Sequence, residues 1–384
     1  MTEIVITGVG AVSTAGAGID RLWEALFKNP VPNAIDVPDF VAPQGADRHT
    51  VQRTDLFAQF AWMAALEACP RPPEVAPWRR SVVFANSMSG PVSYHDAEVA
   101  LAQLGPRHVS KALPTQTIPN AGAAIIASEF DAQGPSLTLS TACAAGTQAI
   151  GVGAAMLRAG EADWVLVAAG DRPTSQAVQA AYRNVGALSP KGIARPFDRD
   201  RDGFVLVGGG AAVVLERESD AKRSGASVLG RVHGWGASMD AGSLTRPRLD
   251  GESAERCIRQ ALDRAALPPD RLCYVSAHGT GTRLNDAAEA AVLARVLGNQ
   301  SVPVGSIKGA IGHSAAAAGM LEAIAVVLAI EHRELPPTIG LRRVDESLPK
   351  LDFLTATRPW QPGPSLSCSF GLGGQNAAVV LGPP

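Results

Sequence analysis

Cys143 lies in the segment LSTACAAG, residues 139–146, where a strand-like run gives way to small residues and then to an Ala-rich helical run. A thiol at the start of a helix has a lowered pKa, because the helix dipole favours the nucleophilic thiolate. Free backbone N–H groups at such a turn could also stabilise an oxyanion. Taken alone, the segment is better explained by a buried structural cysteine at a crowded turn.

Two further turns of small residues carry histidines. His278 lies in AHGTGT, residues 277–282, ahead of Asp286 and Glu289, and KGAIGH, residues 308–313, begins with Lys308 and ends with His313. A histidine on a loop at a strand end is well placed to face a pocket. Each turn also has a simpler explanation. His278 could merely satisfy loop carbonyls, and Lys308 and His313 could lie on the surface beside tightly packed helices.

Together the three turns favour one chemistry, the formation of a carbon–carbon bond by decarboxylation. The Cys143 thiolate would accept an acyl group. His278 and His313 would donate hydrogen bonds to the enolate oxygen left when carbon dioxide departs.

Two other motifs are rejected as sites. DRDRDG, residues 198–203, resembles the start of a calcium loop, but its twelfth position is Gly209 and two arginines oppose a cation. GVG, residues 8–10, partly matches a dinucleotide fingerprint, but the third glycine position holds Ser13.

These turns must be positioned by the elements around them, and strand-like and helical segments alternate throughout the chain, which predicts a layered α/β fold. Strands are expected at residues 3–7, 81–85, 136–139, 164–169, 210–216, 227–235, 272–277, 302–305, 366–369 and 377–381. Helices are expected at residues 19–27, 57–68, 121–130, 144–158, 174–185, 253–265, 286–297 and 316–331. Residues 30–53 and 240–250 are predicted to be loops, and the charged stretch 216–225 a helical bridge between two loosely similar halves.

Composition narrows the class of protein. The 384 residues are 46% hydrophobic and 18% charged, with a net charge of -2, which indicates a globular chain and no nucleic-acid partner. We expect no membrane-spanning segment and no secretory signal, because no apolar run is judged long enough and the first residues lead straight into a strand-like run. The five cysteines are odd in number and widely spaced, so we expect neither a metal site nor disulfides, and a cytoplasmic protein.

The ordered motifs resemble the beta-ketoacyl-ACP synthases of the thiolase superfamily over nearly the whole chain. The motifs that carry the resemblance are ITGVG (6–10), IPN (118–120), GPS (134–136), TAC (141–143), RPFD (195–198), RDGF (201–204), HGTGT (278–282), Lys308 with GH (312–313), and SFGLGGQN (369–376). The resemblance implies a five-layered αβαβα fold of two similar halves, at residues 1–222 and 223–384. It also implies a dimer, as a homodimer or as a heterodimer with a second ketosynthase-like chain.

The same resemblance implies roles for individual residues. Cys143 would take an acyl chain from the phosphopantetheine of an acyl carrier protein, with no bound cofactor or metal, and His278 and His313 would assist decarboxylation of malonyl-carrier protein. Lys308 and Glu289 match positions that orient and polarise the histidine site. The oxyanion hole would use the backbone N–H groups of Cys143 and Leu372. Four residues match supporting positions: Asp286, Thr280, Thr282 and Phe370.

The sequence departs from the family pattern at several points. Leu372 stands where the family usually has an aromatic gate, so gating by a swinging ring is not expected to operate in the usual way. VGGG, residues 207–210, lacks the usual acidic residue. Gly309 stands where the family usually has Ser or Thr, and Ala145 where it commonly has Ser. These differences indicate a divergent synthase, of a type II polyketide or aryl-polyene-like kind. Acyl chain length, and whether the pathway makes fatty acids or polyketides, stay open.

Three alternatives and one partner surface complete the expectations. The chain could be a non-catalytic, chain-length-factor-like partner, although such chains usually lack the cysteine. An initiating synthase usually has Asn in place of one histidine, and a degradative thiolase needs a second cysteine motif, whereas Cys368 is expected to be structural. Because carrier proteins are acidic, Arg53 and Arg201 are the candidates for docking one, although both could equally be ordinary solvated arginines.

Overall fold

The computed structural model describes residues 2–30, 33–71 and 74–384. One extended sheet runs through the molecule in the strand order β11-β9-β8-β13-β14-β7-β1-β6-β5-β3-β4, with β2 paired to β1. In the first part of the chain the strands are β1 (Ile4–Ser13), β2 (Gly16–Ala17), β3 (Arg80–Ala85), β4 (Ser136–Leu139), β5 (Trp164–Asp171) and β6 (Gly209–Arg217). In the second they are β7 (Gly230–Met239), β8 (Tyr274–Ser276), β9 (Pro303–Gly305), β11 (Asp352–Phe353), β13 (Ser365–Gly371) and β14 (Gln375–Gly382), and β10 (Glu334–Leu335) pairs separately with β12 (Arg358–Pro359).

Helices cover both faces of this sheet and fill its centre. The first part of the chain contributes α1 (Ile19–Ala25), α2 (Arg48–Gln52), α3 (Leu56–Ala68), α4 (Pro91–Leu104), α5 (Leu113–Thr117), α6 (Ala121–Glu129), α7 (Ala145–Ala159), α8 (Gln176–Asn184) and α9 (Glu218–Ser224). The second part contributes α10 (Glu252–Arg264), α11 (Arg283–Leu297), α12 (Lys308–Ile311) and α13 (Ala318–His332). Short 3-10 turns are η1 (Pro77–Arg79), η2 (Pro106–His108), η3 (Ala142–Ala144), η4 (Pro269–Arg271) and η5 (Ala315–Ala317).

The two halves repeat one strand arrangement. The order β4-β3-β5-β6-β1 is parallel up to β5 and antiparallel after it, and β9-β8-β13-β14-β7 has the same order and the same directions. The halves join where β1 pairs with β7, from Ile4 opposite Val232 to Ile6 opposite Gly230. This repeat confirms the prediction of two similar halves. The charged stretch between them does form a helix, α9, while the boundary between residues 222 and 223 stays a prediction.

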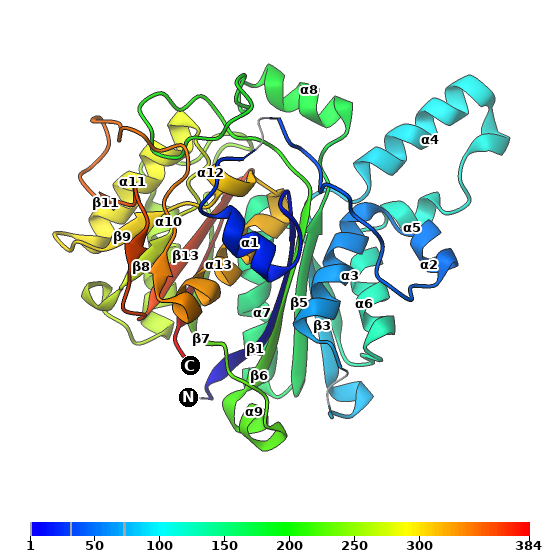
Figure 1. Ribbon diagram of the computed structural model, residues 1–384, viewed down its shortest axis with the longest axis horizontal. Coiled ribbons are helices and arrows are strands. Elements are labelled where there is room, and N and C mark those ends of the chain that lie inside the picture. Colours follow the sequence, from blue (N-terminus) through cyan, green and yellow to red (C-terminus); the bar gives the residue numbers. More distant parts are fainter. Residues whose placement is uncertain (1, 31–32, 72–73) are drawn as a thin grey trace.

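Figure 1 shows five layers, with α3 and α6 outside one half of the sheet, α7 and α13 between the halves, and α10 and α11 outside the other. Each helical layer has its own apolar core, and the largest core surrounds α7 and α13. Every residue from 318 to 330 of α13 is buried. The αβαβα prediction is therefore confirmed, and it places the N-termini of α7 and α13 together inside the molecule.

The partial dinucleotide motif has a packing role. A side chain on Gly8 or Gly10 would place its Cβ 1.9 Å from the carbonyl oxygen of Ala68 or 2.0 Å from that of Ala64. The glycines of β1 therefore let α3 approach the sheet closely, as contact at this range requires.

Several elements differ from those expected. α2 lies inside the predicted loop 30–53, of which residues 31–32 fall outside the described residues, and Asp47 caps it by accepting the N–H of Thr50. α4 was not predicted because none of its residues is buried, so it lacks the apolar periodicity that marks a helix packed on a core. Figure 1 shows α4 projecting from the body of the molecule.

The run Ala315–His332 is long and apolar enough to cross a membrane by length and composition, contrary to the expectation that no run is. It is 89% buried inside the fold. Its apolar character is therefore explained by its place as η5 and α13 in the central layer, with protein on all sides.

Candidate active site

Cys143 lies in the turn between β4 and α7. Ala142, just before it, has a left-handed backbone with φ 48°, and the 3-10 turn η3 leads into α7. Gly371 at the end of β13 packs on this turn, since a Cβ there would lie 2.9 Å from the carbonyl oxygen of Thr141. The small residues of the motif thus allow two segments to meet closely. They present the Cys143 side chain, which is partly exposed, at the helix N-terminus as predicted.

His313 lies directly against this thiol. Its Nε2 is 3.2 Å from Sγ of Cys143. The backbone of His313 is fixed on both sides, because its N–H donates to the carbonyl of Val205 at 2.8 Å and its carbonyl accepts the N–H of Val207 at 3.0 Å. The ring of Phe204 packs edge-on at 5.3 Å between centroids. The fold thereby brings into contact two residues that are 170 positions apart in the sequence.

His278 completes the group of three. Its ring is perpendicular to that of His313, with centroids 5.3 Å apart, and Phe370 packs edge-on to it at 6.0 Å. Lys308 Nζ lies 3.2 Å from Nδ1 of His278 and donates to the His278 carbonyl at 2.6 Å. Because an ammonium can only donate, Nδ1 must accept and the ring proton resides on Nε2. Lys308 thus fixes the tautomer that makes His278 a donor.

Glu322 is a member of the site that the sequence analysis did not assign. This residue of α13 is fully buried and forms an ion pair with Lys308, itself only 1% exposed. Ser369 Oγ lies 3.5 Å from Glu322 and 2.8 Å from Thr147 Oγ1. A carboxylate inside an otherwise apolar helical run was the available signal, because a buried charge requires a partner of opposite sign.

Glu289 and Asp286 act on the backbone around His278 rather than on its ring. Glu289 accepts the N–H groups of His278 and Gly279 at 2.7 and 2.8 Å. Asp286 accepts those of Gly281 and Phe197 at 3.1 and 2.8 Å. Both carboxylates are buried, and burial raises the pKa of Glu289 to about 8. They hold the histidine turn in place from the first turns of α11.

Thr280 and Thr282 support the start of that helix. Their hydroxyls are 3.0 Å apart, and Thr282 caps α11 by accepting the N–H of Asn285 at 3.3 Å. This capping contact also explains why α11 begins at Arg283, three residues before the predicted start.

The site is electrostatically tuned toward neutral groups. Burial, followed by the nearby Lys308 charge, holds the pKa of His278 and of His313 well below the usual range, so both imidazoles are neutral at pH 7. Burial also raises the pKa of Cys143 to about 11, although Lys308 and the backbone N–H groups of Leu372 and Cys143 act in the opposite direction. The predicted lowering of the thiol pKa at the helix N-terminus is therefore outweighed by desolvation.

Leu372 reaches the site through its backbone. Its N–H lies near enough to the Cys143 sulfur to act against the raised pKa of the thiol, while the Leu372 residue is 49% exposed. A second N–H, that of Cys143 itself, acts at the same atom. Whether these two groups form the oxyanion hole stays a prediction, and their position beside the reacting sulfur is the geometry that it requires.

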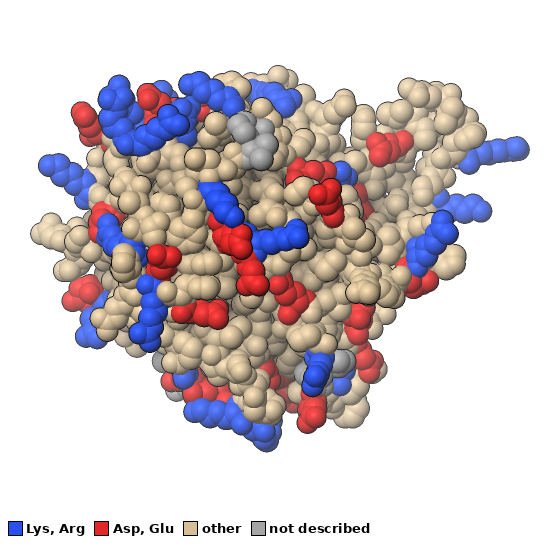
Figure 2. Space-filling model, in the orientation of Figure 1, with Lys and Arg blue, Asp and Glu red and all other residues tan. Residues whose placement is uncertain are grey.

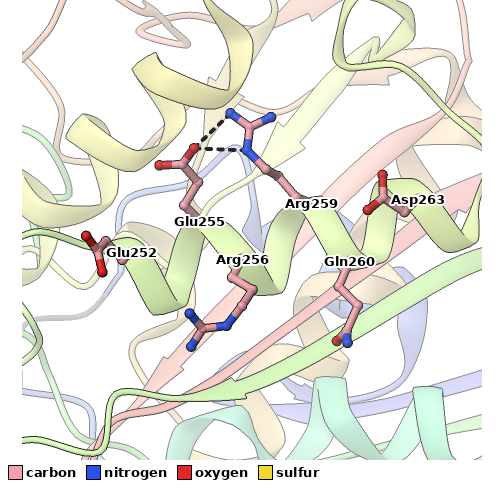
Figure 3. Close-up of a pocket in the computed structure, with 6 residues that line it drawn as sticks. All are labelled: Glu252, Glu255, Arg256, Arg259, Gln260 and Asp263. Atoms are coloured by element: carbon pink, nitrogen blue, oxygen red, sulfur yellow. Dashed lines mark hydrogen bonds and ion pairs between the residues drawn. The ribbon is translucent and has the colours of Figure 1, made fainter.

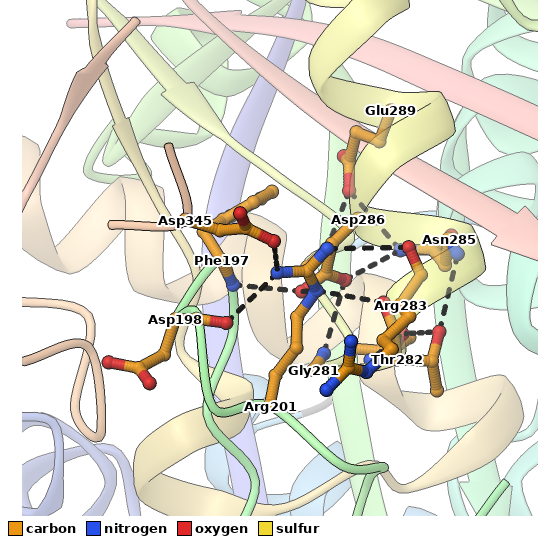
Figure 4. A network of polar contacts seen from close by, with 12 residues as sticks. Phe197, Asp198, Arg201, Gly281, Thr282, Arg283, Asn285, Asp286, Glu289 and Asp345 are labelled. Carbon is orange, nitrogen blue, oxygen red and sulfur yellow. Dashed lines mark hydrogen bonds and ion pairs between the residues drawn. The ribbon is translucent and has the colours of Figure 1, made fainter. Parts of the chain in front are cut away.

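Arg201 was predicted to dock a carrier protein, and this prediction is wrong. The side chain is only 3% exposed, and it pairs with Asp345 at 2.6 Å and with Asp286 at 3.6 Å. Figure 4 shows the guanidinium enclosed by these carboxylates and by the loop before α11. A buried, paired guanidinium cannot meet a partner protein, so Arg201 braces the His278 turn. Arg53, at the end of α2, is exposed and remains a candidate.

The other cysteines have no polar constellation like that of Cys143. Cys69, Cys257 and Cys368 are buried, as expected of small core residues, and Cys273 is partly exposed. Within residues 2–30, 33–71 and 74–384, no three His, Cys, Asp or Glu side chains are grouped so that they could hold a metal ion.

A surface hollow drawn in Figure 3 lies along α10, in an outer layer of the fold, and not at the Cys143 turn. It is lined by side chains of both charges, and Arg259 pairs with Glu255 at 2.8 Å. It contains no nucleophile, and we assign it no chemistry.

The sequence matches the family described as "Beta-ketoacyl synthase, N-terminal domain" over residues 40–221 and "Beta-ketoacyl synthase, C-terminal domain" over residues 229–342. It is 32% identical to a protein of Coxiella burnetii named 3-oxoacyl-[acyl-carrier-protein] synthase 2, over 99% of this chain and 98% of that one.

Two solved structures share the fold. The ishigamide ketosynthase/chain length factor superposes with a TM-score of 0.92 and 29% identity, over 100% of this chain and 99% of that one. A type II PKS acyl-carrier protein in complex with its ketosynthase, bound to the hexaketide, contains a chain that superposes with a TM-score of 0.90 and 26% identity, over 100% of both chains.

Proposed function

The chain belongs to the beta-ketoacyl synthase family, and we propose that it elongates an acyl chain held on Cys143 by decarboxylative condensation with malonyl-carrier protein. The observation that carries the proposal is the contact of 3.2 Å between Cys143 Sγ and His313 Nε2, beside a His278 whose tautomer Lys308 fixes. The substrates arrive on the phosphopantetheine of an acyl carrier protein, and the residues need no other cofactor.

The first step is acyl transfer to the thiol. Because the Cys143 thiol is protonated at neutral pH, it loses its proton to water as sulfur attacks the acyl thioester, while the neutral His313 keeps its own proton on Nε2. The new bond joins Sγ to the acyl carbon, and the bond to the pantetheine sulfur breaks. Water supplies a proton to the leaving pantetheine thiolate, so His313 stays in the neutral Nε2–H form that the second step uses.

The second step joins two carbons. The bond between the malonyl methylene and its carboxylate breaks, carbon dioxide leaves, and the electron pair forms an enolate at the thioester. Nε2–H groups of His278 and His313 stabilise the enolate oxygen. The methylene carbon then attacks the acyl carbonyl on Cys143, while the N–H groups of Cys143 and Leu372 stabilise the transient oxyanion. Collapse releases the Cys143 thiolate and a product two carbons longer.

A direct test follows carbon dioxide and product together. The protein, an acyl-carrier protein and carboxyl-labelled malonyl-carrier protein should release label in proportion to the β-ketoacyl product. Acyl transfer without release of label would show a transferase that does not elongate. Neither activity, despite a folded protein, would contradict the proposal.

A chain-length-factor role is the second candidate, favoured by the ketosynthase/chain length factor likeness and by Leu372 at the gate position. The assembled Cys143, His278 and His313 favour the active role instead. A non-catalytic partner would co-purify with a second ketosynthase-like chain and carry no acyl group when alone.

We further propose that the protein works in the cytoplasm as a homodimer or as a heterodimer with a second ketosynthase-like chain. β4 forms an edge of the sheet and leaves Leu137 41% exposed. The projecting α4 exposes Tyr94, Leu101 and Leu104. An exposed strand edge with apolar side chains is a surface that a second chain can cover. Sedimentation of the pure protein, alone and with candidate partners, tests this proposal.

We propose Arg53 as a docking residue for the carrier protein, because it is exposed and carrier proteins are acidic. Figure 2 shows positive and negative side chains interspersed over the face in view, which favours a local contact. Arg53→Glu should weaken binding of an acidic carrier protein several-fold at low ionic strength, while Arg107→Glu on η2 serves as the exposed control. If Arg53→Glu and the unaltered protein bound the carrier protein with equal affinity, Arg53 would not be part of the docking surface.

A further inference from the structure

Asp171 is a buried carboxylate that the reaction steps above do not use. It is the last residue of β5 and has no exposed surface. Its Oδ2 accepts the N–H of Ser87 at 3.0 Å, the N–H of Ala316 at 3.2 Å and the Ser87 hydroxyl, and its Oδ1 accepts the N–H of Met88 at 3.3 Å. One side chain thus joins β5, the segment after β3 and the start of the α13 region.

The contact with Ala316 connects Asp171 to the reacting groups. Ala316 lies three residues after His313, in the 3-10 turn η5, and Ala315 between them has a left-handed backbone with φ 47°. The carbonyl of Ala316 in turn faces Gly146 of α7, where a Cβ would lie at 2.5 Å. The turn that follows His313 is therefore held between Asp171 on one side and the Cys143 helix on the other.

A left-handed alanine costs on the order of 1 kcal/mol and persists only when its surroundings fix it. Ala316 directly follows the left-handed Ala315, and its N–H donates to the Asp171 side chain. This hydrogen bond is the side-chain contact that holds the turn in its conformation. We propose that Asp171 is a positioning residue, which keeps His313 within reach of the Cys143 sulfur by anchoring the η5 turn through Ala316. This inference rests on the proposed function only for its catalytic consequence.

The charge of Asp171 acts on the same site. The titratable groups whose pKa responds to this charge are Cys143 on η3 and Tyr182 on α8; burial is the larger cause of the raised pKa of both, and the negative charge of Asp171 adds to it. Burial raises the pKa of Asp171 itself to about 6, so the carboxylate is mostly ionised at pH 8. Removal of the charge should therefore make the Cys143 thiolate easier to form.

Two variants separate position from charge. Asp171→Ala removes the acceptor of the Ala316 N–H, so malonyl decarboxylation should fall at least tenfold in kcat with little change in KM. Asp171→Asn keeps an oxygen for that N–H and loses the charge. It should recover most of the decarboxylation, while its Cys143 reacts several-fold faster with iodoacetamide at pH 8 than that of the unaltered protein.

Ser87→Ala is the matched control, because it removes one hydrogen bond of Asp171 but leaves its charge and its contact with Ala316. It should change both rates by less than threefold. Decarboxylation by Asp171→Ala within twofold of the unaltered protein would overturn the proposal, as would an unchanged alkylation rate in Asp171→Asn. If Asp171→Ala does not fold, Asp171→Asn must still show faster alkylation. Absence of decarboxylation in the unaltered protein would instead contradict the proposed function.

Discussion

The turn before α7 and the turn before α13 share a backbone and differ in what they carry. Each is a 3-10 turn that begins with a left-handed alanine, Ala142 at φ 48° or Ala315 at φ 47°, and each leads into a helix of fifteen residues. The residue after that alanine is Cys143 in the first turn and Ala316 in the second. The first turn therefore carries a thiol, the proposed nucleophile, while Ala316 of the second donates its N–H to Asp171.

In the proposed mechanism, the repeated fold divides one reaction between its two halves. In the second half the corresponding turn carries no reactive side chain. The histidines lie outside it, His313 just before the turn and His278 on the loop after β8. Buried side chains hold the His278 loop in position. Lys308 contacts the His278 ring, Glu322 pairs with Lys308, and Glu289 accepts the His278 N–H. The thiol of the first half instead has backbone N–H groups beside it, its own and that of Leu372 from the second half.

The largest expected effect concerns the support of the second half. Lys308→Met leaves Glu322 buried without a partner of opposite charge, and the loss of one member of such a pair costs about 3–5 kcal/mol. The free energy of unfolding, from urea titration at pH 7.5, should fall by that amount. The double variant with Glu322→Leu should recover most of it. A double variant as unstable as the single one would show that the ion pair is not the reason.

The histidines should matter for decarboxylation more than for acyl loading. Loss of one donor to a developing oxyanion costs about 10²–10³-fold in kcat. His278→Ala should show this loss in carbon dioxide release while Cys143 still becomes acylated. His108→Ala, an exposed histidine on η2, is the control. If His278→Ala released carbon dioxide at the rate of the control, the second half would not carry the decarboxylation.

The Cys143 thiol should ionise only at alkaline pH. Since its pKa is raised to about 11, the thiolate fraction grows about tenfold per pH unit through neutral and mildly alkaline pH. Alkylation of Cys143 should therefore keep rising from pH 7 to pH 10, measured in a Cys273→Ala background that removes the other partly exposed thiol. A plateau below pH 8 would mean that the helix N-terminus outweighs burial, contrary to this account.

The smallest effect tests the shared backbone itself. Glycine relieves a left-handed conformation but adds freedom to the unfolded chain, so the two contributions nearly offset each other. Ala142→Gly and Ala315→Gly should each change the free energy of unfolding by no more than about 1 kcal/mol. Ala323→Gly inside α13 should be clearly destabilising, as glycine is within a buried helix. A large loss for only one of the turns would show that they are not equivalent.

The sequence allowed a layered α/β fold and three turns with potentially reactive side chains to be predicted, because small-residue turns and strand–helix alternation are local signals. The residues around His278 were indicated only by the family resemblance. Glu322 was visible only as an interruption of an apolar run, since its partner Lys308 is fourteen residues away and no local pattern links them. Asp171 gave no signal, because its two partner segments, at residues 87–88 and at Ala316, lie far from it in the chain. Arg201 was misplaced because an arginine in a charged loop usually faces solvent, and only the fold buries it against Asp286.

The balance between burial and dipole at Cys143 also could not be read from the sequence. A helix N-terminus is recognisable from its small residues, but the surrounding layers that desolvate the thiol come from both halves. The same limit applies to α4, which has no buried face to produce a pattern.

The most direct measurement is intact-protein and peptide mass spectrometry after incubation with acyl-carrier proteins of several chain types. The account predicts one acyl group per chain, located on the peptide that contains Cys143, absent in Cys143→Ala and unchanged in Cys273→Ala. The preferred acyl type would be obtained at the same time. Acylation of Cys143→Ala at another residue, or an unaltered protein that accepts no acyl group from any carrier, would contradict the assignment of Cys143 as the nucleophile.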